Sequence, residues 1–148
     1  MSTYTQILYH IVFSTKNRER TLDIAHRERI LKYIWGIIKN TKSHLYQINL
    51  MEDHVHILCS IHPTICLSDF VKKIKTSAGV WMKEEEISPL FTNWQAGYGA
   101  FTVAWHDKDT IMEYIKNQQE HHKIMDFRSE YQKLLDEFGI DYDKMYLP

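Results

Sequence analysis

Two histidines, His54 and His56, stand two positions apart inside the largely apolar segment DHVHIL at residues 53–58. If this segment is a β-strand, side chains at i and i+2 share a face and lie about 7 Å apart, so both imidazoles can reach one ion. Imidazoles in an apolar strand also need partners for their nitrogens. The pattern therefore suits a metal site, or two hydrogen-bonded histidines near a strand end, because two ligands alone do not specify a metal site.

A second set of polar side chains follows Asp109, in a stretch predicted to be helical. Tyr114 and Gln118 are i and i+4, which places a phenol and an amide on one helical face about 6 Å apart. A helix lying over the histidine strand would present both groups to a substrate bound to the ion. The pattern alone equally describes a tyrosine that packs its ring with a solvated hydroxyl, followed by a surface glutamine.

The elements that must position these residues follow from hydrophobic periodicity. Strands are predicted at residues 7–14, 45–51, 54–61, 94–98 and 100–105, and amphipathic helices from 24 to about 40 and from 67 to about 86. Two further helices are predicted, one capped by Asp107 or Asp109 and reaching Glu120 or beyond, and one capped by Asp126 and ending before Gly139. The order β-α-β-β-α-β, with an extra strand and two C-terminal helices, matches a ferredoxin-like (split βαβ) α+β fold, an antiparallel sheet with helices on one face.

The composition is typical of a single globular domain spanning residues 1–148. Hydrophobic residues make up 44% of the chain and aromatic residues 13%, and a chain of 148 residues buries enough surface to fold without disulfides. The only cysteines, Cys59 and Cys66, form no spaced framework, which favours a reducing compartment. The N-terminus lacks a signal-peptide pattern, and no apolar run approaches the roughly 20 residues that span a bilayer. A cytoplasmic protein is predicted.

Charge is distributed unevenly, although the formal net charge of -1 argues against binding nucleic acid by bulk charge. Lys and Arg outnumber Asp and Glu in residues 1–50, and the reverse holds in residues 101–148. Lys72, Lys73 and Lys75, together with Trp81, put basic and aromatic side chains on one predicted helix, a composition that suits a single-stranded DNA channel. The alternative for these lysines is a solvated helix face.

Five segments place these candidate residues in a recognisable order. They are YHIVFSTKNRER at 9–20, MEDHVHIL at 51–58, SDFVKKIKTSAGVW at 68–81, NWQAGYGAFTV at 93–103 and YIKNQQEHH at 114–122. With these segments the chain resembles, along almost its full length, the HUH single-tyrosine transposases, the TnpA family of insertion sequences of the 200/605 type. A His-hydrophobic-His pair is common by itself, but its combination with a Tyr-x-x-x-Gln helix and a Gly-Tyr-Gly-Ala-Phe segment is specific.

The resemblance implies roles for particular residues. His54 and His56 would bind a divalent ion, Tyr114 would be the nucleophile, and Gln118 would be the third ligand. The neighbouring residues Gln119, His121 and His122 leave the identity of that third ligand open. In the family the domain dimerises, and the tyrosine helix of one subunit can complete the site of its partner. A homodimer with a shared active site is therefore expected.

The implied activity is metal-dependent nicking and rejoining of single-stranded DNA at hairpin-bearing insertion-sequence ends, through a 5′-phosphotyrosine. Two neutral imidazoles and an amide leave the ion its charge and open positions, which suits Mg²⁺ or Mn²⁺ better than structural zinc. A repeat-associated tyrosine transposase, which processes dispersed palindromic repeats, would use the same site. The same residues could instead belong to a non-cleaving single-strand nucleic-acid binding module, or to a metallohydrolase with a metal-bound water as nucleophile.

Overall fold

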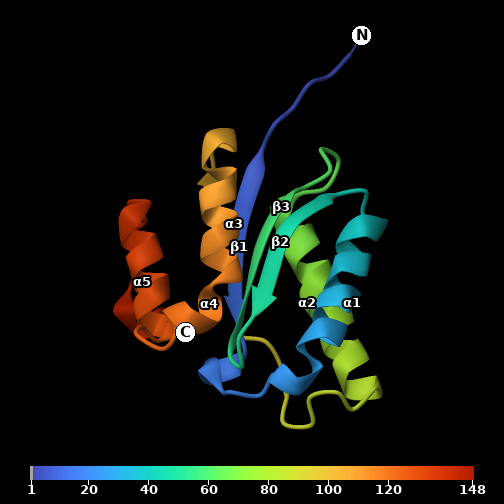
Figure 1. Cartoon of the computed structure of the whole chain (residues 1–148), viewed down its shortest axis with the longest axis vertical. Helices are drawn as coiled ribbons and strands as arrows, with labels where there is room; N and C mark the ends of the chain where they lie inside the picture. Colours follow the sequence, from blue (N-terminus) through green and yellow to red (C-terminus); the bar gives the residue numbers. More distant parts are fainter. Residues whose placement is uncertain (1) are drawn as a thin grey trace.

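A computed structural model describes residues 2–148, which form a four-stranded antiparallel sheet flanked by helices (Figure 1). The strands are β1 Leu8–Ser14, β2 His44–Leu50, β3 His54–Ser60 and β4 Gly99–Val103, in the spatial order β2-β3-β1-β4. The helices are α1 Arg27–Asn40, α2 Leu67–Glu84, α3 Lys108–Lys116, α4 Gln118–His121 and α5 Phe127–Glu137. This order and topology confirm the predicted ferredoxin-like α+β fold.

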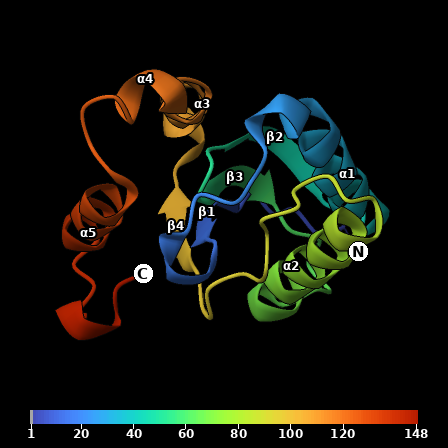
Figure 2. The same cartoon turned by 90° about the horizontal axis from the view of Figure 1, so that it is seen from below.

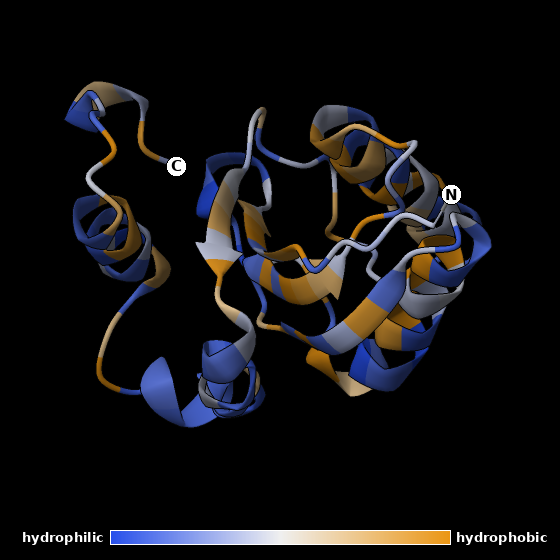
Figure 3. Ribbon diagram, turned by 90° about the horizontal axis from the view of Figure 1, so that it is seen from above, coloured by the Kyte–Doolittle hydropathy of each residue, from blue (hydrophilic) through white to orange (hydrophobic). Residues whose placement is uncertain are grey.

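One face of the sheet packs against α1 and α2, as the amphipathic patterns predict. Ile11 and Phe13 of β1 and Val55 and Ile57 of β3 point to this face, because strand side chains alternate. They join the buried apolar stripes of α1 and α2 in the main core, where each fully buried large side chain contributes about 1.5–3 kcal/mol. Figure 3 shows hydrophobic residues on the sheet and along these two helices. Within residues 2–148, no helix is long and apolar enough to cross a membrane.

The opposite face of the sheet is covered by the helices that follow β4. Figure 2 shows α3 and α4 on the side away from α1 and α2, with α5 beyond β4. Leu8 and Leu58 pack with Ile115 of α3, and Val12 and Phe101 pack with apolar side chains of α5. The helices that the sequence predicted on one face of the sheet correspond to α1 and α2. The predicted C-terminal helices form a second layer, over the other face.

The predicted strand at residues 94–98 is wrong. Trp94 makes only an isolated bridge to Thr15, and the regular strand begins at Gly99. The ammonium of Lys75 donates hydrogen bonds to the backbone carbonyls of Gln95 and Gly97, at 2.8 and 2.9 Å. These carbonyls are thus satisfied by a side chain instead of a strand ladder, and Gly97 has a φ of 86°, which is outside the extended region.

Candidate metal and tyrosine site

The predicted histidine pair lies on the face of the sheet that α1 and α2 do not cover. His54 and His56 are on β3, a central strand between β2 and β1, and both are fully buried. They alternate with Val55 and Ile57, which point into the main core. The period of two read from the sequence is therefore confirmed, and both imidazoles point into the layer beneath α4 and α5.

The Nδ1 atom of each imidazole has a hydrogen-bond partner that fixes the orientation of the ring. Nδ1 of His54 lies 2.6 Å from the Asp53 carboxylate, and Nδ1 of His56 lies 2.8 Å from Nε2 of His10 on β1. Both Nε2 atoms are consequently free to face the interior of the site. Burial lowers the pKa of His10 to about 3 and also lowers the pKa of His56, which favours neutral rings. Neither Asp53 nor His10 was predicted from the sequence as a positioning residue.

A break between two helices brings Gln118 to the histidines. The helix predicted to continue through Glu120 ends as α3 at Lys116, and the short α4 begins at Gln118. Asn49 of β2 reaches this break and donates to the carbonyls of Ile115 and Lys116, at 3.0 and 3.4 Å. Gln118 is fully buried there, and its Oε1 lies 3.4 Å from Nε2 of His54.

Tyr114 lies on the last turns of α3 and points its hydroxyl into the same cluster. Its ring centre lies 6.0 Å from that of His56 in an edge-on arrangement, and its side chain is partly buried. The hydroxyl donates a hydrogen bond to Glu130. Burial raises the pKa of Tyr114, and the negative charge of Glu130 raises that pKa further. The phenol is therefore held protonated, next to a carboxylate.

Glu130 of α5 is a further component of the site that was not predicted from the sequence. This carboxylate is buried, and it accepts hydrogen bonds from His56, His122 and Gln118 at 3.0, 3.1 and 3.0 Å. Burial by itself raises the pKa of Glu130, but the hydrogen bonds from His122, His56 and Tyr114 outweigh it and hold the pKa below the usual range.

A signal for Glu130 was present in the sequence. Phe127, Glu130 and Leu134 follow the spacing of one helical face, and all three are buried in α5. An acidic residue in the apolar stripe of an amphipathic helix requires a buried partner. That signal was hidden because the partners come from β3 and from the segment before α5, which the local pattern does not reveal.

A group of donor atoms in this cluster is suited to a metal ion. One donor atom from each of His54, His56, His122 and Glu130 lies within 4.8 Å of every other. Imidazole and carboxylate are ligands for divalent transition metals, and carboxylate and amide oxygens are also ligands for Mg²⁺. The site therefore has the donor types that a divalent ion requires.

The remaining candidates for the third ligand differ in position. Gln119 pairs with Asn49 of β2 at 2.9 Å. His121 packs edge-on against Tyr114, with ring centres 5.1 Å apart, and its Nε2 lies 3.4 Å from Glu130. Gln118 and His122 are thus the two whose side chains reach the histidine pair.

All of these side chains come from one chain. Tyr114 and Gln118 lie over the histidine strand of the same molecule. A cleft of about 350 Å³ between the end of β4, α3 and α5 reaches Tyr114 and Glu130. It is a route by which a substrate could approach the phenol. The homodimer and the shared site remain predictions.

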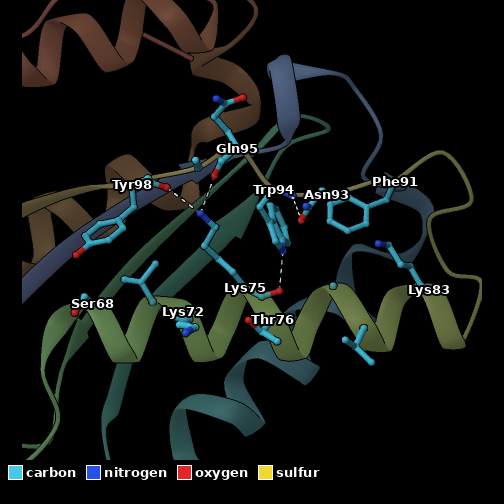
Figure 4. Close-up of a pocket in the computed structure, with 15 residues that line it drawn as sticks. Ser68, Lys72, Lys75, Thr76, Lys83, Phe91, Asn93, Trp94, Gln95 and Tyr98 are labelled. Carbon is cyan, nitrogen blue, oxygen red and sulfur yellow. Dashed lines mark hydrogen bonds between the residues drawn. The ribbon is translucent and has the colours of Figure 1, made fainter. Parts of the chain in front are cut away.

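The predicted DNA-binding residues of α2 lie on the other side of the sheet from the histidines. Lys72 and Lys75 line a hollow of about 530 Å³ between α2 and the segment at residues 91–98 (Figure 4). Lys75 is bonded there to two carbonyls, as described above, whereas Lys73 is exposed. Trp81 does not join this hollow, because its ring stacks on Tyr33 of α1 at 4.2 Å. The structure therefore does not bring the predicted basic and aromatic residues together.

Known proteins similar to this chain are transposases. The family described as "Transposase IS200 like" matches residues 3–118. The ISDra2 transposase TnpA of Deinococcus radiodurans is 23% identical over 78% of this chain and 86% of its own length. The transposase of insertion sequence element IS200 of Salmonella typhimurium is 27% identical over 78% of this chain and 79% of its own length.

Two solved structures share the fold. A crystal structure described as a transposase from Deinococcus radiodurans has a TM-score of 0.61 and 26% identity, covering 80% of this chain and 95% of that one. A REP-associated tyrosine transposase bound to a REP hairpin also has a TM-score of 0.61, at 15% identity, covering 82% of this chain and 74% of that one. The matched family region, residues 3–118, includes the histidine strand and Tyr114 and ends at Gln118.

Proposed function

Because the chain belongs to the family of IS200-like transposases, we propose that it cuts and rejoins single-stranded DNA with Tyr114 as the nucleophile. His54, His56 and Gln118 are proposed to hold a divalent ion, Mg²⁺ or Mn²⁺. The single observation that carries this proposal is the phenol of Tyr114 in the same cluster as both histidines. A tyrosine that only packed its ring would not need to donate its hydroxyl to Glu130, the buried carboxylate that His56 and Gln118 also contact.

The chemistry follows from the groups at the site. The phenolic oxygen of Tyr114 attacks phosphorus, the bond from phosphorus to the 3′ oxygen breaks, and the products are a 5′-phosphotyrosine and a free 3′-hydroxyl. The phenolic proton leaves Tyr114, and the departing 3′ oxygen takes up a proton. A divalent ion held by His54, His56 and Gln118 would supply positive charge that offsets the negative charge building on the phosphate. Attack by a 3′-hydroxyl on the phosphotyrosine reverses the step and joins strands without a nucleotide cofactor.

A hairpin-bearing DNA end is the proposed substrate. The family relationship supports an insertion-sequence end, and a structural neighbour is bound to a REP hairpin. Processing of dispersed palindromic repeats would use the same site, and the DNA flanking the gene distinguishes the two functions. Paired hairpins that bound the gene favour mobilisation of an element, and scattered palindromes elsewhere favour repeat processing. A homodimer is proposed from the family and is checked by light scattering.

The direct test is formation of a covalent adduct. Single-stranded oligonucleotides that carry hairpins from the flanking DNA are incubated with the protein and Mg²⁺ or Mn²⁺, and adducts are separated on a denaturing gel. Tyr114→Phe and His56→Ala are expected to abolish the adduct, whereas Tyr4→Phe, at an exposed tyrosine, keeps it. Hairpin binding without cleavage by the unaltered chain would indicate a binding module, and cleavage that survives Tyr114→Phe would indicate a water nucleophile.

A further inference from the structure

Among the residues that the structure describes, no Lys or Arg forms an ion pair with Glu130. Its side chain is 1% exposed, and among residues 2–148 its ion-pair partners are all histidines, namely His54, His56, His121 and His122. Removing a carboxylate from water is costly unless positive charge or a full set of hydrogen bonds replaces the water. The cluster therefore combines a buried anion with imidazoles, a combination that a bound cation would complete.

Three imidazole nitrogens gather around one oxygen of the Glu130 carboxylate. Nε2 atoms of His56, His122 and His54 lie 3.0, 3.1 and 3.6 Å from Oε1 of Glu130. His56 and His122 hydrogen-bond this oxygen, which has two lone pairs, and His54 lies just beyond hydrogen-bond distance of it. Ligands bound about 2.1 Å from an octahedral ion lie about 3.0 Å from one another at right angles. The separations of His56 and His122 from Glu130 match this spacing, and the donor atom of His54 lies within 4.8 Å of all three.

The other oxygen of Glu130 faces the nucleophile. Oε2 accepts hydrogen bonds from the Tyr114 hydroxyl and from Nε2 of Gln118, the latter at 3.0 Å. The two oxygens of one carboxylate thus have different partners: Oε1 faces His54, His56 and His122, and Oε2 faces the phenol, Gln118 and His121. The carboxylate of Glu130 therefore lies between the phenol of Tyr114 and the imidazole nitrogens of His56 and His122.

We propose that Glu130 and His122 are metal ligands in addition to those of the proposed function, and that Glu130 also positions the hydroxyl of Tyr114. Both residues lie beyond residues 3–118, the region that the family matches. The segment from α4 to α5 would then convert a neutral donor set into one with an anionic ligand, which binds a divalent cation more tightly. This inference rests on the proposed function, because it presupposes an ion at His54 and His56.

Metal affinity of the full chain tests the proposal without any DNA. The protein is freed of metal, titrated with MnCl₂ and followed by calorimetry. Glu130→Gln keeps the shape of the side chain and removes its charge, and we expect its Kd for Mn²⁺ to rise by about tenfold or more. Glu137→Gln makes the same change at an exposed position of the same helix and should leave the Kd within about twofold.

Three further variants make the result interpretable. His56→Ala should lose Mn²⁺ binding, and if it binds like the unaltered chain, the proposed metal site itself fails. If His56→Ala loses binding while Glu130→Gln keeps it, only the role of Glu130 is overturned. Should Glu130→Gln fail to fold, as judged by circular dichroism, Glu130→Asp and His122→Gln replace it. Weaker binding in both supports the proposal, and unchanged affinity in both contradicts it.

A spectroscopic readout separates a ligand from a neighbouring residue. Co²⁺ bound in place of Mn²⁺ has visible absorption bands that respond to the number and type of its ligands. The Glu130→Gln protein saturated with Co²⁺ should show a changed spectrum, because an anionic oxygen has left the ion. A spectrum identical to that of the unaltered chain would show that Glu130 does not touch the metal.

Discussion

Asp53 and His54 form one of the shortest polar contacts at the site, with 2.6 Å between Oδ1 and Nδ1. A carboxylate behind a ligating imidazole fixes its tautomer and makes the other ring nitrogen a better donor to a metal. Asp53→Asn keeps a hydrogen-bond acceptor but removes the charge. We expect the Kd for Mn²⁺, measured by calorimetry, to rise about 10–100-fold.

A matched control exists elsewhere in the chain. Asp23 pairs with His26 at 2.9 Å, but both side chains are considerably exposed and lie outside the cluster. Asp23→Asn should leave Mn²⁺ affinity unchanged. Equal affinities for both variants and the unaltered chain would show that the Asp53 charge does not act on His54.

At the level of single residues, the sequence predicted those features of the site that follow from the local periodicity of a strand or helix. The shared face of His54 and His56 follows from strand geometry, and the structure confirms it. Placing Gln118 beside them needed the family resemblance, because the chain reaches that position through a helix break fixed by Asn49 of β2. The helical pattern of a sequence does not reveal contacts of this kind with a distant strand.

At the level of elements, α5 begins at a well-defined cap. The Asp126 carboxylate accepts a hydrogen bond from the backbone N–H of Ser129 at 2.9 Å, as the sequence predicted for this position. Asp126→Ala should lower the free energy of unfolding by about 1 kcal/mol in urea denaturation. Asp141→Ala, at an exposed acid beyond the helix, should change it by less than about 0.5 kcal/mol. Equal losses would contradict the capping role.

The contact between β4 and α5 depends on a glycine. A Cβ added to Gly99 would lie 2.7 Å from Cε2 and 3.0 Å from the hydroxyl of Tyr131, which is on α5. Gly99→Ala should therefore push α5 away from the sheet and destabilise the chain by about 1–3 kcal/mol in urea denaturation. Gly36→Ala, in α1 with nothing within 4 Å of the new Cβ, should instead stabilise it by up to about 1 kcal/mol. A neutral Gly99→Ala would contradict close packing here.

The sequence predicted the positions of most elements to within a few residues. It did not predict how the C-terminal helices pack on the sheet. Regular alternation and helical stripes identified β1, β2, β3, α1 and α2. The strand prediction for residues 94–98 was wrong because the strand-like composition there reflects packing in the core and not pairing in the sheet. Trp94 is a buried core residue packed edge-on against Phe13, at 5.0 Å, while Lys75 satisfies the backbone.

At the scale of the whole molecule, the site joins the sheet to the C-terminal helices, which are not part of the main core. Its side chains come from β3, from α3 and α4, and from α5, whereas the main core contains β1, β3, α1 and α2. An ion held by these side chains would link the C-terminal helices to the sheet. Unfolding would release that ion, so metal binding should stabilise the native state.

This linkage has a measurable size. Mn²⁺ at about 100 times its Kd should add about 2.7 kcal/mol to the free energy of unfolding. For a chain of this length that corresponds to a rise in Tm of about 5–10 °C, measured by scanning calorimetry. EDTA should reverse the shift, and His56→Ala should abolish it, whereas His106→Ala, an exposed histidine, should not. An unchanged Tm for the unaltered chain would argue against an ion in this cluster.

The most direct test of the proposed chemistry is to identify the residue that carries the DNA. The adduct formed with a hairpin-bearing single strand is digested with protease and nuclease, and the modified peptide is sequenced by mass spectrometry. We predict a nucleotide on Tyr114, with a free 3′-hydroxyl on the released strand. A nucleotide on a different tyrosine, or cleavage that leaves a 5′-phosphate and no adduct, would contradict this mechanism.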